Sequence, residues 1–533
     1  MKKIQWGIIG AGHIAEAMAE AVNKGVANAE LYGVASTDLN RGKAFASKWQ
    51  IPHVYSSYQS LLEDPEVQIV YIATPHMNHA ELSIKAMKNG KAVICEKPGA
   101  VNAAQLRQVL AVSQETGMFY MEALWSKFQP CYLRAMEWIA EGKIGDLKAI
   151  HSSFCINKPN VANYPSSGYQ TSRLYDPSLA GGALLDLGIY TLTLALCAIR
   201  SISKTGAISG YILPSKVQSM AHIGSTGVDE YETISLQFNT MGKQIYASLT
   251  NGITMELHLE TKSAQILGSK AAIRMKDFWH PQELELCSPE GTILERVELP
   301  FEVNGYEYEA REITDIVASE KKEIESKKHS HLQSLQCLQI MDSLRKDWKL
   351  VYPFEENITM SSFADSVKPT YPTESQTSAT KTDRDIVVYT DGACSGNPGS
   401  GGWGAVILVD GEEIRLSDGE KVTTNNRMEL MAAISSLEKI ALNPDWAGRD
   451  ISVYIDSQYV KNGITTWIKS WKKNGWKTAN KEPVKNKDLW MELDELVEGL
   501  SLRWVWVKGH AGNKYNEICD ELAVSAGKKA ALS

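Results

Sequence analysis

Four carboxylates in the last third of the chain have the types and positions of ligands for hard metal ions. Asp391 and Asp456 each follow a predicted strand, Glu429 lies at the start of a predicted helix, and Asp520 lies within another. Clustered carboxylates raise one another's pKa values unless cations neutralise them, and oxygen ligands of this kind suit Mg²⁺ or Mn²⁺. Two such ions would activate a water and stabilise the leaving oxygen of a phosphodiester. His510, in a glycine-flanked loop, could assist the proton transfer.

A basic segment, residues 467–489, could bind nucleic acid. Lysines neutralise phosphates, and an indole can pack against a deoxyribose. The whole chain carries 55 Lys and Arg against 63 Asp and Glu, a net charge of −8, so it is not a basic nucleic-acid binder overall. A run of charges is more often only a solvated face. The residues predicted to contact nucleic acid are Trp471, Lys472, Lys473, Trp476, Lys477 and Lys485.

A glycine-rich turn at the start of the chain predicts a dinucleotide site. The predicted strand Ile4–Ile9 leads into the pattern G-x-G-x-x-A, formed by Gly10, Gly12 and Ala15. The first glycine allows a tight turn, the second lets the backbone approach a pyrophosphate, and the alanine lets the next helix pack closely on the strand. The N-terminus of that helix offers unpaired N–H groups and a positive dipole end to the phosphates.

The end of the second predicted strand bears on the choice of nucleotide. Leu31–Ala35 is followed by Ser36, Asp38 and Arg41. Ser36 and Arg41 could hold a 2′-phosphate, whereas Asp38 could bind a ribose or merely cap the following helix. NADP is the preferred prediction, and NAD stays open.

Lys97 and Tyr190 are candidate groups for moving a proton. Lys97 follows Glu96 at the end of a predicted strand, and the carboxyl edge of a parallel sheet is where ligands bind. Its ammonium group can hydrogen-bond a substrate hydroxyl and favour the alkoxide during hydride removal. Asp186 and Tyr190 are four residues apart, so they share one face of a predicted helix. Lys97 and Tyr190 close together could shuttle one proton to or from a carbonyl oxygen.

The first 354 residues resemble the Gfo/Idh/MocA oxidoreductases, and most closely a branch of dimeric dihydrodiol and D-xylose dehydrogenases. The resemblance rests on G-x-G-x-x-A, on E-K-P, on M-E-A-L-W-S-K-F at 121–128 and on G-G-A-L-L-D-L-G-I-Y at 181–190. It implies NADP-linked oxidation of a sugar or trans-diol and a homodimer built through the second lobe. By position it implies that Lys97 and Tyr190 are catalytic, that His79 contacts cofactor or substrate, that Glu96 is the acid of E-K-P, and that Trp125 and Trp279 line the substrate pocket.

The last part of the chain resembles bacterial ribonuclease HI over residues 385–530. The motifs are Y-T-D-G-A-C-S-G-N-P-G, N-N-R-M-E-L, Y-I-D-S-Q-Y, V-K-G-H-A-G and N-E-I-C-D-E-L-A. The resemblance implies hydrolysis of the RNA strand in RNA–DNA hybrids, with all four carboxylates and the histidine in place. It also implies that the basic segment grips the DNA strand, and that amides read the minor groove. These amides are Asn397, Asn425, Asn426 and Gln458.

The length of 533 residues is too great for one core, so two or three domains are expected. The predicted fold is α/β throughout. We expect a doubly wound Rossmann domain at 1–125, an open-sheet substrate and dimerisation domain at 126–354, a Ser-, Thr- and Pro-rich linker at 355–384, and a ribonuclease H-like mixed-sheet domain at 385–533.

The remaining features favour a cytoplasmic enzyme. No apolar run is long enough for a membrane span, and the eight cysteines are scattered without a C-x-x-C pair. The principal hypothesis is a chain with two enzymes. The alternative is that only the nuclease is catalytic, with the first block serving as a dinucleotide or sugar sensor or as a dimerisation module.

Overall fold

The structure is a computed structural model, and it folds as two compact units that divide between Lys368 and Pro369. The predicted linker lies outside the described residues, except for Glu355. The structure describes residues 3–157, 173–202, 212–240, 243–254, 262–319, 323–355, 386–410, 412–441, 446, 449–478, 482, 484–497, 500–507 and 513–532.

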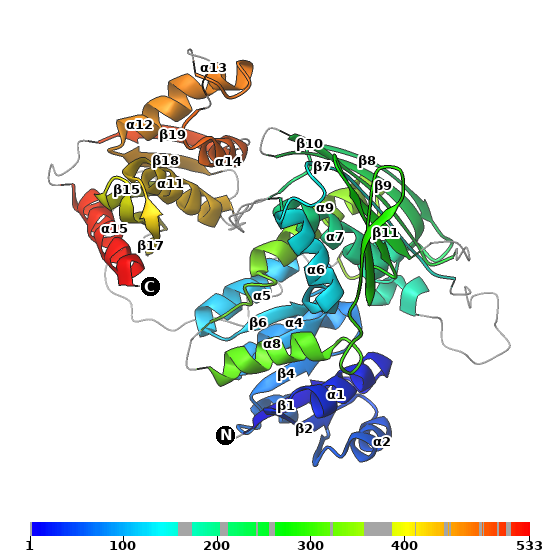
Figure 1. Ribbon diagram of the computed structural model, residues 1–533. Coiled ribbons are helices and arrows are strands. Elements are labelled where there is room, and N and C mark those ends of the chain that lie inside the picture. Colours follow the sequence, from blue (N-terminus) through cyan, green and yellow to red (C-terminus); the bar gives the residue numbers. More distant parts are fainter. Residues whose placement is uncertain are drawn as a thin grey trace, which may run out of the picture. The chain divides into compact units, whose positions relative to one another are not determined.

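The first unit opens with a six-stranded parallel sheet of order β3-β2-β1-β4-β5-β6. Its middle strands are buried along their whole length, as expected of a sheet covered on both faces. This confirms the predicted doubly wound architecture (Figure 1). The strands are β1 (Ile4–Ile9), β2 (Ala29–Ala35), β3 (His53–Tyr55), β4 (Ile69–Ile72), β5 (Ala92–Glu96) and β6 (Tyr120–Ala123), and the helices are α1 (His13–Gly25), α2 (Leu39–Trp49), α3 (Tyr58–Glu63), α4 (His79–Lys88) and α5 (Ala103–Thr116).

A second sheet of eight strands follows, in the order β14-β13-β12-β11-β7-β10-β9-β8. It is mixed, because β7 pairs parallel with β10 and antiparallel with β11. Residues 264–275 form a hairpin of two antiparallel strands, because residues 269–271 leave the ladder. The strands are β7 (Leu147–Cys155), β8 (Lys216–Ile223), β9 (Asp229–Thr240), β10 (Lys243–Gly252), β11 (Ser263–Gly268), β12 (Ala272–Lys276), β13 (Glu283–Cys287) and β14 (Ile293–Glu298).

Two late helices cross the domain boundary that the sequence predicts. The helix α8 (Glu307–Ala318) packs on α1, and α9 (His331–Trp348) packs on α5. Their apolar faces are therefore buried against the first sheet's helices, so the last part of the first unit returns to the first sheet. The second sheet carries α7 (Ile189–Arg200) against β7, with α6 (Pro130–Ala140) beside it.

Among the described residues, one stretch is long and apolar enough to cross a membrane by length and composition. This is Pro177–Arg200, and 94% of its most apolar window is buried inside the fold. Such burial is typical of a core helix, which explains the apolar sequence without a membrane.

The second unit is built on a five-stranded mixed sheet of order β17-β16-β15-β18-β19. Alternating residues of β16 face two different helices: Gly402 and Gly404 closely approach α15, while Trp403 and Ala405 pack with Met428 of α11. This confirms the predicted ribonuclease H-like sheet. The elements are β15 (Ile386–Gly396), β16 (Gly399–Val409), β17 (Glu412–Thr423), α11 (Asn425–Ala441), β18 (Asp450–Ile455), α12 (Gln458–Asn462), α13 (Ile468–Lys473), α14 (Lys487–Val497), β19 (Ser501–Trp506) and α15 (Lys514–Leu532).

The stretch 392–399, which follows the strand predicted before Asp391, is mostly strand. β15 continues to Gly396 and β16 begins at Gly399, so only Asn397 and Pro398 make the turn. Asp391 thus lies within a strand rather than at its end. It is nevertheless the first residue of β15 beyond the parallel pairing with β18, which ends at Thr390 and Ile455.

Glu355, predicted as the first linker residue, belongs to the fold of the first unit. Its carboxylate pairs with Arg345 at 2.9 Å and accepts a hydrogen bond from the Asn102 side chain at 2.8 Å. Arg345 also pairs with Asp342, whose carboxylate accepts the Ala103 N–H at the start of α5. The pairs connect the end of this unit to the helix α5, and both Arg345 and Glu355 are largely removed from water.

Replacing Arg345 with methionine is expected to lower the free energy of unfolding of the first unit by about 3 kcal/mol, because Glu355 would lose its counter-charge. Denaturant unfolding of the full chain, with a probe in this unit, measures the loss. The control Arg274→Met removes the more exposed pair with Glu285 and should cost less than about 1 kcal/mol. Equal losses in the two variants would contradict the role of Arg345.

Candidate active sites

Three of the four predicted metal ligands of the second unit meet at one edge of its sheet. Asp391 projects from β15, Asp456 directly follows the neighbouring strand β18, and Glu429 lies in the second turn of α11. One carboxylate oxygen from each of the three lies within 4.8 Å of the others. Such a group offers a set of hard oxygen ligands to a divalent cation.

A close approach of helix and strand makes this geometry possible. A Cβ atom at residue 392 would lie 2.4 Å from the backbone nitrogen of Glu429 and 2.7 Å from the carbonyl carbon of Met428. Only glycine fits there, so Gly392 lets the start of α11 lie directly against β15. Asp391 and Glu429 are thereby brought together.

The three clustered carboxylates repel one another, and a bound cation would neutralise their charge. Burial, together with the charges of Asp456 and Asp520, raises the pKa of Asp391 to about 7. Burial and the charges of Asp391 and Asp456 raise the pKa of Glu429 well above its usual range. The Oε2 atom of Glu429 is buried without a hydrogen-bond partner among the described residues. The donor set and this unsatisfied oxygen fit a divalent metal ion.

Asp520 and His510 differ from the other predicted catalytic residues. Asp520 lies on α15 outside the three-carboxylate group, although its charge contributes to the raised pKa of Asp391. His510 lies outside the described residues, so its predicted role stays a prediction.

Two asparagines orient the carboxylates. Asn516 of α15 donates from Nδ2 to Asp456 Oδ2 at 3.1 Å, and Asn425 donates from Nδ2 to Glu429 Oε1 at 3.4 Å. Sequence reasoning missed Asn516, although its position four residues before Asp520 put it on the same helical face. Asn425, predicted to read the minor groove, here contacts a carboxylate. The other predicted reading amides, Asn397, Asn426 and Gln458, are exposed.

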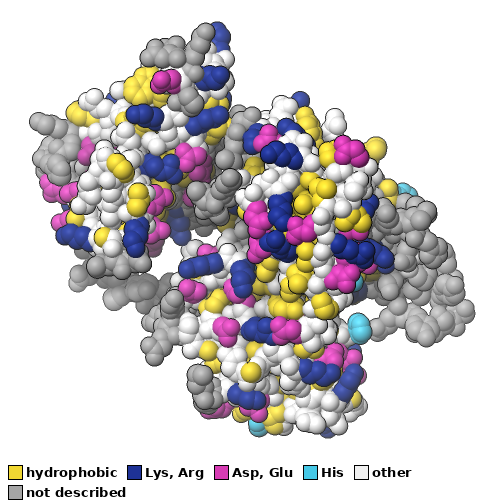
Figure 2. Space-filling view, in the orientation of Figure 1, with side chains coloured by type: hydrophobic (Ala, Val, Ile, Leu, Met, Phe, Trp, Pro, Cys, Tyr) yellow, Lys and Arg dark blue, Asp and Glu magenta, His cyan; other side chains and the backbone are white. Residues whose placement is uncertain are grey.

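The described part of the basic segment includes α13 and the turn that follows it, and the segment ends in the first turn of α14. Figure 2 shows Lys and Arg side chains at the surface around α13. Lys473, Lys477 and Lys485 are exposed, whereas Lys472 pairs with Asp494 at 2.7 Å. Both predicted contact tryptophans, Trp471 and Trp476, are half-buried against the core. Their packing supports the segment, while Lys473, Lys477 and Lys485 offer exposed cationic groups.

The predicted dinucleotide turn of the first unit has the required backbone. Gly10 has φ of +100°, and a Cβ atom there would lie 2.4 Å from the carbonyl oxygen of Ala73. Gly12 precedes α1 without a side-chain cap, and open space surrounds the position of its missing Cβ atom. Ala15 is fully buried, as close helix packing requires. The free helix end and the open space at Gly12 fit a bound pyrophosphate.

At the end of β2, Asp38 caps a helix. Its carboxylate accepts the backbone N–H groups of Asn40 and Arg41 at the start of α2. The Arg41 guanidinium folds back to donate to Ser36 Oγ at 3.2 Å and to Thr37 Oγ1 at 3.1 Å. A cation and two hydroxyls are thus grouped beside the strand end, a suitable donor set for a phosphate.

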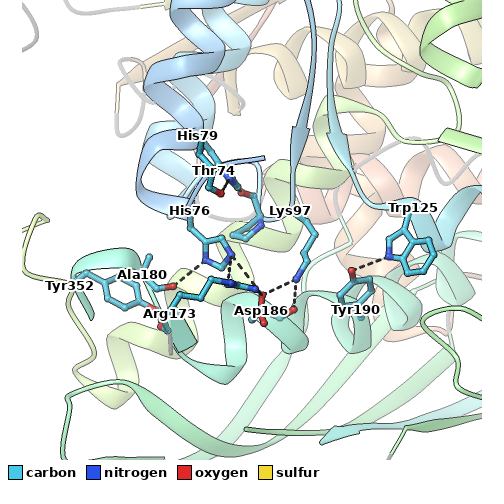
Figure 3. A network of polar contacts seen from close by, with 12 residues as sticks. Thr74, His76, His79, Lys97, Trp125, Arg173, Ala180, Asp186, Tyr190 and Tyr352 are labelled. Carbon is cyan, nitrogen blue, oxygen red and sulfur yellow. Dashed lines mark hydrogen bonds and ion pairs between the residues drawn. The ribbon is translucent and has the colours of Figure 1, made fainter. Parts of the chain in front are cut away.

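Lys97 is anchored to Asp186. Its Nζ donates to Asp186 Oδ1 at 2.9 Å and to the backbone carbonyl of Asp186 at 2.7 Å (Figure 3). Arg173 donates to the same Oδ1 at 2.9 Å, and His76 Nε2 lies 3.7 Å from it. Burial alone would raise the pKa of Asp186, but Arg173 and Lys97 hold it well below its usual range. Arg173 has no motif that could have marked it in the sequence.

Tyr190 lies beside this pair without being its direct partner. Lys97 Nζ lies 5.1 Å from the centroid of the Tyr190 ring, and the Tyr190 hydroxyl accepts the Trp125 indole N–H at 3.1 Å. Residues Leu184–Gly188 form a π-helical turn before α7, so the regular helical face predicted for Asp186 and Tyr190 is interrupted. Both residues still reach Lys97, from different sides.

His79 and Glu96 are used inside the protein. The ring nitrogens of His79 lie 2.7 Å from the Pro98 carbonyl and 2.8 Å from the Thr74 carbonyl. Glu96 accepts the Tyr71 hydroxyl at 2.5 Å, and burial raises its pKa. They support the loops around the site, and a direct contact with cofactor stays a prediction.

Aromatic rings form a wall next to Tyr190. Trp125 stacks on Tyr306 with centroids 4.1 Å apart, and Trp279 stacks on Phe154 at 5.2 Å. The ring centroids of Trp125 and Trp279 lie 5.9 Å apart, so the two tryptophans expected to line the substrate pocket are neighbours.

Replacing Asp391 with asparagine is expected to stabilise the metal-free second unit at neutral and higher pH. The pKa of this carboxyl is near its ordinary value of 3.8 in the unfolded chain and is raised to about 7 in the folded unit. Between these values the folded state binds more protons, so the free energy of unfolding falls as pH rises. Asparagine does not titrate, so in the variant this fall in the free energy of unfolding with rising pH is absent. Calorimetry of the full chain in chelator across this range measures it, with exposed Asp418→Asn as control. Identical pH dependence in the Asp391 variant and the wild type would contradict the assignment.

Comparison with known proteins assigns each unit to a family. The ribonuclease H family matches residues 383–528. The ribonuclease H of Treponema denticola is 58% identical over 157 residues, covering 27% of this chain and 98% of the relative. That of Rhodopseudomonas palustris (strain BisB5) is 56% identical over 140 residues, covering 26% of this chain and 90% of the relative.

The oxidoreductase family with an NAD-binding Rossmann fold matches residues 4–124, and the GFO/IDH/MocA C-terminal domain matches residues 132–274. Solved structures share this fold at low identity. The 3-ketoreductase KijD10 from Actinomadura kijaniata, in complex with NADP and TDP-benzene, is 22% identical with a TM-score of 0.53, covering 65% of this chain and 98% of that one. The aldose-aldose oxidoreductase from Caulobacter crescentus is 19% identical with a TM-score of 0.55 and the same coverage. The chain therefore belongs to the ribonuclease H family through its second unit and to the Gfo/Idh/MocA oxidoreductases through its first.

Proposed function

We propose that the second unit cleaves the RNA strand of RNA–DNA hybrids with Asp391, Glu429, Asp456 and Asp520 as ligands of Mg²⁺ or Mn²⁺, two ions at a time. The observation that carries this assignment is the set of three carboxylates within 4.8 Å, one of which has an unsatisfied buried oxygen. Bound there, the metal would supply an activated water and charge for the leaving oxygen. Asn516 and Asn425 hold two of the carboxylates in orientation. His510 is proposed to assist proton transfer.

The exposed amides and lysines are proposed to hold the hybrid. Asn397, Asn426 and Gln458 would contact the minor groove, where a 2′-hydroxyl distinguishes RNA from DNA. Lys473, Lys477 and Lys485 would neutralise phosphates of the DNA strand. The exposure of all six side chains leaves them free to make these contacts.

Replacing Lys473, Lys477 and Lys485 together with alanine is expected to raise KM for a hybrid with little change in kcat, because the lysines bind phosphates away from the reacting bond. The slope of log KM against log salt should fall by about 2 to 3. Steady-state cleavage at several salt concentrations measures both. The matched control replaces the exposed Lys528 and Lys529 at the end of α15. A KM unchanged at moderate salt would contradict the role of the three lysines.

We propose that the first unit is an NADP-linked dehydrogenase of a sugar or trans-diol hydroxyl. Gly10, Gly12 and Ala15 would hold the pyrophosphate, and Ser36 and Arg41 the 2′-phosphate, which NAD lacks. The cofactor would supply the hydride acceptor. The aromatic wall of Trp125 and Trp279 suits a ring-shaped substrate.

The chemistry would centre on Lys97. Asp186 holds the ammonium group at 2.9 Å and balances its charge, so Lys97 is fixed to hydrogen-bond the substrate hydroxyl and favour the alkoxide. The Tyr190 hydroxyl, positioned by Trp125, is the second group proposed to contact the reacting oxygen.

Replacing Lys97 with methionine is expected to lower kcat for NADP⁺ reduction by about a hundredfold or more, because the group that holds the substrate proton is lost. NADPH affinity should change little. Wild type and variant are compared over a panel of pentoses, hexoses and trans-diols, with Lys85→Met on the exposed face of α4 as control. A wild type that binds NADPH but oxidises nothing in the panel would favour a sensor role instead.

A further inference from the structure

A buried chain of hydrogen bonds runs from Lys127 to the backbone that follows Lys97. Lys127 Nζ lies 2.8 Å from His329 Nδ1, His329 Nε2 lies 3.1 Å from Glu122 Oε2, and Glu122 Oε1 accepts the Gly99 N–H at 2.7 Å. Glu122 and Lys127 are close in sequence, His329 is 207 residues from Glu122, and each residue is at most 5% exposed. A buried ionic chain of this length needs an explanation.

The chemistry of the groups fixes the direction of the chain. An ammonium group only donates, so His329 Nδ1 accepts from Lys127 and Nε2 carries the proton given to Glu122. Burial and the charge of Lys127 lower the pKa of His329 to about 4, so the ring is neutral at pH 7. Burial alone would raise the pKa of Glu122, but hydrogen bonds from His329, Ser334 and Gly99 hold it below its ordinary value. The ionised Glu122 is thus balanced by Lys127 through a neutral imidazole.

The turn after Lys97 is held at each polar backbone group. The Pro98 carbonyl faces His79 Nδ1 at 2.7 Å, the Gly99 N–H donates to Glu122, and the Gly99 carbonyl accepts the Tyr120 hydroxyl at 3.4 Å. A Cβ atom on Gly99 would lie 2.4 Å from the Tyr120 hydroxyl oxygen, so the turn is packed tightly against β6. Glu122 makes the one charge-assisted contact of the three, the stronger kind of hydrogen bond.

The short segment of residues 122–127 also contacts Tyr190, the other proposed catalytic group, through Trp125. Glu122 and Lys127 flank Trp125, which donates to Tyr190. Lys127 additionally donates to the Gln333 side chain on α9, which ties the segment to the late helix. The charges of Glu122 and Lys127 are therefore placed to hold both proposed catalytic groups at once.

We propose that Glu122 is a positioning residue for Lys97, held in place by Lys127 through His329, an inference that rests on the proposed dehydrogenase. Glu122 fixes the backbone from which Lys97 extends, and a displacement of about 1 Å there is enough to cost a hundredfold in rate.

The test uses full-length Glu122→Ala and has two independent measurements. Hydrogen exchange read by mass spectrometry should show faster exchange in peptides spanning residues 97–101, with the nuclease unit unchanged. Steady-state kinetics should show kcat for NADP⁺ reduction lowered about tenfold or more, with NADPH affinity within about twofold and hybrid cleavage unchanged. Lys127→Met should show the same pattern more weakly. Lys91→Met is the matched control, because Lys91 is also buried but binds the carbonyls of Asp64 and Val67 before β5.

A paired substitution tests the turn without removing charge. Gly99→Ala should speed exchange and lower kcat, because its Cβ atom meets the Tyr120 hydroxyl, and adding Tyr120→Phe should restore both. Unchanged exchange at 97–101 in Glu122→Ala, or a parallel fall of kcat, NADPH affinity and melting temperature in the Lys91 control, would overturn the inference. A wild type without oxidising activity would refute the dehydrogenase, and exchange alone would then decide whether Glu122 holds the turn.

Discussion

A carboxylate removed from water needs a cation, hydrogen-bond donors or a proton, and this requirement organises both units. In the first unit the protein itself meets this requirement at three carboxylates, whereas the buried Glu309 has no hydrogen-bond partner among the described residues and burial raises its pKa. Asp186 is held by Lys97 and Arg173, Glu122 by His329 and the Gly99 N–H, and Glu355 by Arg345. The second unit gathers carboxylates and leaves one oxygen of Glu429 without a partner among the described residues.

The two candidate sites use their carboxylates for two kinds of chemistry. A dehydrogenase needs a fixed positive group beside the reacting oxygen, so its carboxylate serves to hold a lysine. A metal-dependent nuclease needs negative charge that the protein leaves uncompensated, because the metal ions supply the balance. Raised pKa values at Asp391 and Glu429 are the mark of that uncompensated charge.

Both units also use a glycine to let two backbone segments approach each other closely. Gly392 lets α11 meet β15 so that Glu429 reaches Asp391, and Gly10 lets the first turn pass beside Ala73. Sequence reasoning identified Gly10 from its pattern, since such turns recur with fixed spacing. Gly392 could be recognised only once the distance from its missing Cβ atom to Glu429 was known.

The resemblance of the sequence motifs identified the two families. The periods of strands and helices predicted the α/β sheets and placed Asp391, Asp456 and Lys97 at strand ends and Glu429 at a helix start. The sequence also left alternatives open for Asp38, which caps α2 in the structure. Only tertiary structure brought Arg173 to Asp186, Asn516 to Asp456 and His329 to Glu122, which is 207 residues away in the chain. The same is true of α8 and α9, which return to the first sheet's helices. Such contacts depend on how elements pack across the chain, and no local pattern of residues encodes which distant partner a buried charge will meet.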